Sequence, residues 1–101
     1  MTYLLLYDNE LSGEIPTEYG NMLSLESLVL SSNNLQGSIP STLGKCSNFV
    51  HLNLSDNLLQ GSITMEIFNC RKLETLSMLG NKLTGTIPSE IKMLNNLMYR
   101  K

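Results

Sequence analysis

The amino-acid sequence repeats itself every 24 residues, and this period constrains the fold more than any other feature. The clearest unit, residues 25–48, carries the pattern Leu-x-x-Leu-x-Leu-x-x-Asn-x-Leu-x-Gly-x-Ile-Pro. Shifting the sequence by one period superimposes three columns of identical residues: Asn9, Asn33, Asn57 and Asn81; Gly13, Gly37, Gly61 and Gly85; Ile15, Ile39, Ile63 and Ile87. Because no insertion or deletion interrupts the period, the sequence predicts a solenoid of stacked coils.

The period predicts one domain over residues 1–101 that contains four complete repeats. They cover about residues 1–24, 25–48, 49–72 and 73–96, and residues 97–101 begin an incomplete fifth repeat in which Tyr99 would follow the column of Thr75 and Arg100 the next core column. Four repeats exceed the minimum of about three that a solenoid needs to bury a continuous core. No terminal cap is expected, since Met1 already lies in a repeat column.

Within one repeat the polarity pattern predicts a short strand followed by an irregular return. Leu52 and Leu54 alternate with His51, Asn53 and Ser55, which is the period of a strand with one buried face. Strands of successive repeats would lie side by side in a parallel sheet. The return is polar and glycine-rich without a long helical period, so we expect 3-10 or short helical turns there. The predicted fold class is an α/β repeat solenoid.

The asparagine column has a predicted structural role. A corner residue that points inward leaves backbone donors and acceptors unpaired, and a primary amide can satisfy both kinds. We therefore expect Asn9, Asn33, Asn57 and Asn81 to form a ladder from coil to coil.

These motifs resemble the leucine-rich repeat, in its plant-type class of 24 residues. The class marker Leu-x-Gly-x-Ile-Pro occupies residues 11–16, 35–40 and 83–88, and in the third repeat Thr64 replaces the proline. The resemblance implies a right-handed coil whose parallel sheet lines a concave face, with a second short strand around the Gly-x-Ile segment.

The resemblance also implies a function. It indicates a non-catalytic scaffold for a protein or peptide ligand, resembling a fragment of the extracellular region of a plant receptor-like kinase or receptor-like protein at the plasma membrane, engaged in signal perception. Further partners would be a co-receptor or neighbouring repeats, and the parent protein would carry a serine/threonine kinase domain outside these residues. The alternatives are a secreted inhibitor of an extracellular enzyme and a structural spacer.

Charge and hydropathy exclude other classes. The net charge of −2 gives no electrostatic footprint for nucleic acid. Residues 1–50 hold five acids against Lys45 alone, so the two halves differ in charge. The apolar run of residues 4–6 is too short for a secretory signal peptide, and no run approaches the roughly 20 apolar residues of a membrane span.

Catalytic, cofactor and metal motifs are not expected. The sequence has no phosphate-binding glycine loop, no His-Glu-x-x-His and no Gly-x-Ser-x-Gly. His51 is predicted to neighbour Ser27 and Thr75 on adjacent strands rather than to reach Ser55. Cys46 and Cys70 share one inward column, where parallel side chains disfavour a disulfide and free buried thiols are expected.

Ligand-binding residues are predicted among the outward strand positions, which the core does not dictate. Four columns cross the predicted concave face: Tyr3, Ser27, His51 and Thr75; Leu5, Val29, Asn53 and Ser77; Tyr7, Ser31, Ser55 and Leu79; Asp8, Ser32, Asp56 and Gly80. Tyr3, Leu5 and Tyr7 form either an anchor patch for a partner or a contact with a further repeat. Asn53 lies in the one glycosylation sequon, Asn53-Leu54-Ser55, and a glycan there would stand on this face; an unused acceptor is the alternative.

Overall fold

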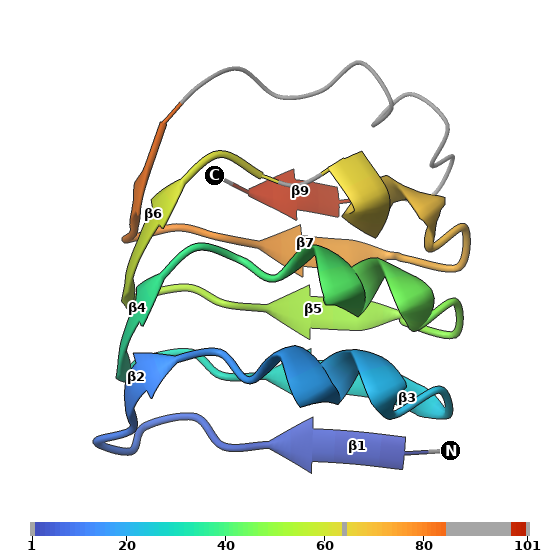
Figure 1. Ribbon diagram of the computed structural model, residues 1–101, viewed down its shortest axis with the longest axis horizontal. Helices are drawn as coiled ribbons and strands as arrows, with labels where there is room; N and C mark the ends of the chain where they lie inside the picture. Colours follow the sequence, from blue (N-terminus) through green and yellow to red (C-terminus); the bar gives the residue numbers. More distant parts are fainter. Residues whose placement is uncertain (1, 64, 85–97, 101) are drawn as a thin grey trace.

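The computed structural model describes residues 2–63, 65–84 and 98–100, and these form a solenoid of parallel strands. The first four coils each contribute one strand to a five-stranded sheet and one to a four-stranded sheet, and a 3-10 helix is described in each of the first three coils (Figure 1). The prediction of a repeat solenoid with 3-10 returns is therefore confirmed. Gly85, Ile87, Pro88 and Leu97, which the repeat pattern includes, lie outside the described residues.

The five-stranded sheet, called the first sheet below, has the order β1-β3-β5-β7-β9, and the second sheet has the order β2-β4-β6-β8. The strands of the first sheet are β1 (Thr2–Leu5), β3 (Leu25–Val29), β5 (His51–Asn53), β7 (Thr75–Ser77) and β9 (Met98–Arg100). Those of the second sheet are β2 (Ser12–Glu14), β4 (Asn34–Gly37), β6 (Leu58–Gly61) and β8 (Lys82–Leu83). The three 3-10 helices are η1 (Thr17–Asn21), η2 (Ser41–Lys45) and η3 (Met65–Asn69).

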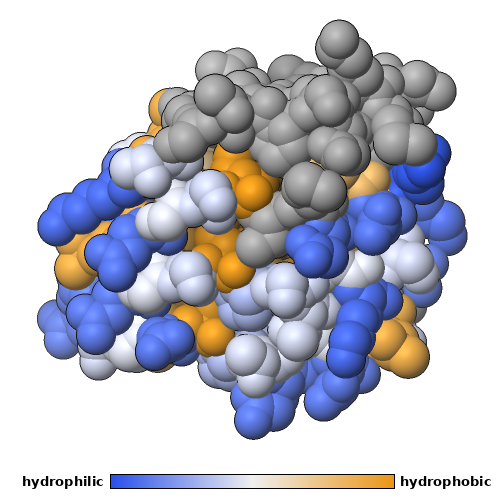
Figure 2. Space-filling view, turned by 45° about the horizontal axis from the view of Figure 1, so that its top comes forward, coloured by the Kyte–Doolittle hydropathy of each residue, from blue (hydrophilic) through white to orange (hydrophobic). Residues whose placement is uncertain are grey.

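The core consists of the leucine columns that the period predicts. Leu28, Leu52 and Leu76 are fully buried on successive strands, and Met78 is as buried as Leu30 and Leu54, whose column it shares. Exposed large apolar side chains are few, and Figure 2 shows a visible surface of mostly hydrophilic and intermediate residues with small hydrophobic patches between them. Removal of these side chains from water is the main stabilising term of the fold.

Proline and glycine set the return path of each coil. Pro16 and Pro40 immediately precede η1 and η2, with extended backbone angles, and their carbonyls accept the first hydrogen bond of each helix. Proline suits this place because it has no N–H to leave unpaired. Neighbouring 3-10 helices pack tightly, since a Cβ atom at Gly20 would overlap the backbone of Thr42.

The second strand of the repeat lies around the start of the Gly-x-Ile segment, as the resemblance implies, since β2 spans Gly13 and β4 and β6 end at Gly37 and Gly61. One prediction needs correction. In β9, Met98 rather than Tyr99 pairs with Thr75, and Tyr99 pairs with the core position Leu76. The register is therefore shifted by one residue from the period, and Arg100 pairs with Ser77 rather than with the core position Leu76.

Candidate functional site: the outward face of the first sheet

The predicted ligand-binding columns are assembled by the register of the first sheet. Tyr3 pairs with Ser27, Ser27 with His51 and His51 with Thr75, so residues 24 apart lie side by side on adjacent strands. The second column, Leu5, Val29, Asn53 and Ser77, follows the same pairing. The remaining two columns lie just beyond the strands, where the pattern of parallel backbone hydrogen bonds continues through Ser31 and Ser55.

One end of this face is apolar and aromatic. Tyr3, Leu5 and Tyr7 are 56%, 52% and 51% exposed, whereas Leu4 and Leu6, which alternate with them, are partly buried against the core. Asp8, also exposed, follows Tyr7 directly and places a carboxylate beside the patch. An apolar surface with an adjacent negative charge suits an apolar or aromatic group that carries a nearby cation.

The centre of the face is polar and internally bonded. His51 Nδ1 lies 2.7 Å from Thr75 Oγ1, and Ser55 Oγ donates a 2.7 Å hydrogen bond to Asn53 Oδ1. Ser55 N–H also donates to Asn53 Oδ1, at 3.1 Å. These bonds hold the side chains in defined positions. Glycosylation of Asn53 in its sequon stays a prediction.

Burial divides the predicted contact residues into two groups. Ser27 is only 6% exposed and Ser55 is also buried, so both offer a partner little surface. Val29, Asn53, Thr75 and Ser77 are partly exposed, whereas His51, Asp56 and Leu79 are exposed. The accessible part of the face is therefore the aromatic end, the His51–Thr75 pair and the far corner at Leu79.

The corner column that follows the strands has left-handed backbone angles. Asp8, Ser32 and Asp56 have φ values of 54°, 57° and 55°, and Gly80 has a φ of 71°. Short polar residues and glycine tolerate this region better than other residues do. The side chain of Asp56 lies against Gly80, where a Cβ atom would overlap its carboxylate.

The asparagine column ties each coil to its neighbour through the backbone. Asn57 Nδ2 donates to the carbonyl of Leu30 in the preceding coil at 2.9 Å, and Asn57 Oδ1 accepts from Leu35 N–H at 3.1 Å. Asn33 and Asn81 make the same kinds of contact. Asn9 is exposed and donates to carbonyls of its own coil. The amides therefore bond to backbone groups rather than to one another.

Both cysteines are free and buried. Cys46 Sγ lies 3.4 Å from the carbonyl of Tyr19, and Cys70 Sγ lies 3.3 Å from the carbonyl of Cys46. Burial raises the pKa of the Cys46 thiol, and burial together with the neighbouring Cys46 raises the pKa of Cys70 to about 11. Protonated thiols of this kind are poor nucleophiles.

The described part of the chain lacks metal-binding clusters and membrane-spanning helices. Within it, no group of three or more His, Cys, Asp or Glu side chains could hold a metal ion. No helix among these residues is long and apolar enough to cross a bilayer.

Sequence reasoning missed one feature of the surface. A shallow groove crosses the outward face of the second sheet, and it is lined by Glu14, Gln36, Gly37, Leu58, Gln60 and Lys82. The paired residues of this sheet are 22 apart, as Glu14 is from Gln36, so columns taken at the 24-residue period do not bring them together. The sequence shows that Gln36 and Gln60 are polar and one period apart, but this does not reveal their partners Leu58 and Lys82 in the sheet.

A repeat solenoid of parallel strands is the class of protein that this fold defines. The family model for the Leucine Rich Repeat matches residues 1–22, 24–46, 48–70 and 72–94. The chain therefore belongs to the leucine-rich repeat family. Comparison with curated protein sequences gave no match.

Solved structures of plant receptor ectodomains are similar to this chain. One is the ectodomain of the receptor kinase GASSHO1/SCHENGEN3 from Arabidopsis thaliana in complex with CASPARIAN STRIP INTEGRITY FACTOR 2. It is 35% identical with a TM-score of 0.91, and the match covers 97% of this chain and 12% of that one. A second is the Arabidopsis HAESA ectodomain in complex with an IDA peptide hormone, at 34% identity and a TM-score of 0.92. The match covers 97% of this chain and 16% of that one.

A third similar structure is the BIR3–SERK2 complex from Arabidopsis thaliana, at 43% identity and a TM-score of 0.85. The match covers 95% of this chain and 52% of that one. The chain thus spans from about an eighth to about half of the solved chains it matches.

Proposed function

We propose that this chain is a segment of a plant receptor-like ectodomain that binds a protein or peptide on the outward face of the first sheet, outside the cell. The observation that carries the proposal is the half-exposed patch of Tyr3, Leu5 and Tyr7. These side chains occupy positions that the core does not dictate, and apolar surface of this kind is a common anchor for a partner. The similar ectodomains solved with peptides support the same function.

The chemistry of the face defines the partner more closely. An apolar or aromatic side chain would pack on the tyrosines, and a basic group beside it would pair with Asp8. The next polar positions, His51 and Thr75, would hydrogen-bond the partner further along the sheet. Five strands at about 4.8 Å span roughly 19 Å, which is about six residues of extended peptide. This segment would supply part of a longer binding surface, shared with neighbouring repeats or a co-receptor, and a kinase domain of the parent protein would transmit the signal.

The test is a peptide selection followed by a matched comparison of variants. Peptides selected on the 101-residue chain would be measured by calorimetry against the double variant Tyr3→Ala, Tyr7→Ala. Loss of an anchor costs about 2 kcal/mol, which is roughly a 30-fold loss of affinity. The control is Leu23→Ala, because Leu23 is 60% exposed and lies in the turn between η1 and β3, outside the four columns of this face.

Two outcomes would contradict the proposal. One is a set of selected peptides whose affinity is lowered equally by the Leu23 variant and the tyrosine variant. The other is the absence of any selected peptide, which would favour the spacer interpretation. The buried Ser27 and Ser55, which leave the centre of the face with few projecting side chains, agree with a spacer role in that case.

A further inference from the structure

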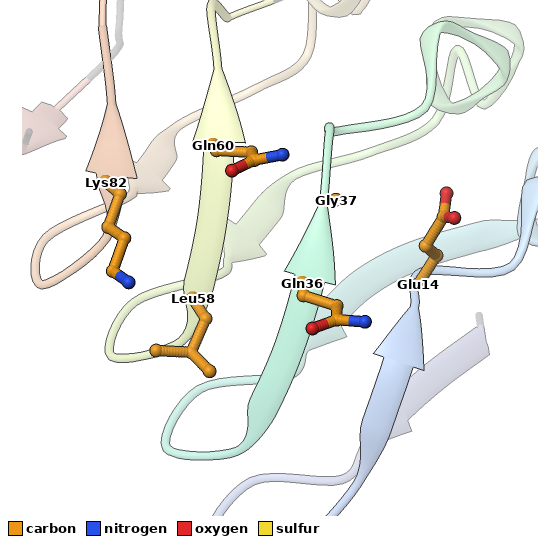
Figure 3. Close-up of a pocket in the computed structure, with 6 residues that line it drawn as sticks. All are labelled: Glu14, Gln36, Gly37, Leu58, Gln60 and Lys82. Atoms are coloured by element: carbon orange, nitrogen blue, oxygen red, sulfur yellow. The ribbon is translucent and has the colours of Figure 1, made fainter.

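The groove on the second sheet lies on a different wall of the solenoid from the first-sheet face. It crosses β2, β4, β6 and β8 (Figure 3). Glu14, Gln36 and Leu58 form one row of paired positions across three strands, and Gln60 and Lys82 form the next row. The two rows place a carboxylate at one end of the groove and an ammonium group at the other.

The polar groups of the groove are available to a partner. Glu14, Gln36, Gln60 and Lys82 are exposed, and none of their side chains makes a hydrogen bond or ion pair with another residue of the described chain. Figure 3 shows Gln36 extending from β4 toward Glu14, and Gln60 extending from β6 toward Gly37. The two primary amides therefore lie along the sheet surface rather than projecting away from it.

Gly37 shapes the floor of the groove. A Cβ atom at this position would meet Glu14 Cγ at 2.8 Å, so the absence of a side chain leaves room for the arm of Glu14. The φ of Gly37 is +81°, which other residues rarely adopt. Beside it, Leu58 is 42% exposed and provides an apolar surface between the two charged ends.

This combination fits an extended peptide better than a neutral sugar chain. A glutamine amide offers one acceptor and two donor hydrogens, which match the N–H and C=O groups of a peptide backbone. Sugar hydroxyls would also bond to the amides, but they would leave the opposite charges at the two ends unused. Glu14 and Lys82 are three strand spacings apart, roughly 15 Å, which is four to five residues of extended chain.

We propose that the groove binds an extended peptide segment of a partner protein, with a basic side chain at Glu14 and an acidic side chain at Lys82. The glutamines bond to its backbone, and an apolar side chain between the charges packs on Leu58. This site is separate from the first-sheet face and goes beyond the function proposed above.

The probe is the blocked peptide Ac-Arg-Ala-Leu-Ala-Asp-NH2, titrated into isotope-labelled protein and followed by NMR. The expected result is a shift of the side-chain NH2 signals of Gln36 and Gln60. The side-chain NH2 signals of Asn33 and Asn57, which are buried in the asparagine column, serve as internal controls and should stay in place.

Charge exchange tests the orientation of the charges. Glu14→Lys should weaken the Arg/Asp peptide by about two- to fivefold, as expected for an exposed ion pair, and should strengthen a peptide with Asp at both ends. Lys82→Glu should weaken it similarly and favour a peptide with Arg at both ends. Glu18→Lys and Lys45→Glu change the net charge equally on η1 and η2, and they should leave the preference unchanged.

Four results would overturn the proposal. The first is the absence of any shift at the glutamine amides, and the second is an equal effect of the control variants. The third is a shift of these amides with a neutral glucan oligosaccharide but not with the peptides, which would assign the groove to a carbohydrate. The fourth is a peptide-induced shift confined to protein signals of β3 and β5. It would locate binding on the first sheet and leave the groove without a ligand, which contradicts this proposal and supports the first-sheet site.

Discussion

Asn57 is the residue whose removal most directly tests the account of how the coils are joined. Its buried amide donates to the carbonyls of Leu30, Leu54 and Ser55, at 2.9, 3.2 and 3.1 Å, and accepts from Leu35 N–H. Asn57→Ala removes all four contacts and leaves a buried N–H and several carbonyls without this partner. An unsatisfied buried group costs about 1–3 kcal/mol, so the variant should lose about 2–4 kcal/mol of unfolding free energy.

Asn9→Ala is the matched control, because Asn9 is exposed and bonds only to the carbonyls of Leu6 and Tyr7 in its own coil. Its loss should stay below about 1 kcal/mol. Urea unfolding gives the global difference, and amide hydrogen exchange gives the local one. In the Asn57 variant, Leu35 N–H should exchange faster, because Asn57 Oδ1 is its acceptor.

Equal losses in the two variants would refute this reasoning, as would unchanged protection of Leu35 N–H. Because solenoids unfold as coupled repeats, the unfolding curve of the variant should also broaden if the central interface weakens first. A single transition as steep as that of the unsubstituted protein, with the expected loss of unfolding free energy, would support the energetic cost of removing Asn57. It would not show where the structure is weakened, which the hydrogen exchange of Leu35 N–H decides.

Two further predictions concern packing and ionisation. Gly20→Ala should lower the free energy of unfolding by about 1–3 kcal/mol, because the new methyl group overlaps the backbone of Thr42, and Gly44→Ala should have a similar effect. An unchanged melting temperature in either variant would contradict the tight packing of the 3-10 helices. The pKa of Cys70 is raised from 9.0 to about 11, so the folded state holds this proton more tightly than the unfolded state does. The resulting stability is complete below pH 9 and declines between pH 9 and about 11. In unfolding measured as a function of pH, Cys70→Ser should flatten this decline.

The sequence by itself determined the architecture. A strict 24-residue period places Leu28, Leu52 and Leu76 in the same environment in successive coils, so one repeat predicts the others. The same reasoning assigned the asparagine column to the coil corners, because an inward amide is needed where backbone groups leave the strand. It also put His51 beside Thr75, since residues one period apart pair in the first sheet.

Only the tertiary structure decided which surfaces are accessible and which residues meet in the second sheet. Ser27 and His51 share one column, yet Ser27 is buried and His51 is exposed, because burial depends on the size of the neighbouring side chains and not on the period. In the second sheet paired residues are 22 apart, two fewer than the repeat period, so Glu14 pairs with Gln36. A shift of two residues keeps each side chain on the same face of the sheet. The groove follows from that offset, and a pattern that compares equivalent positions cannot detect it.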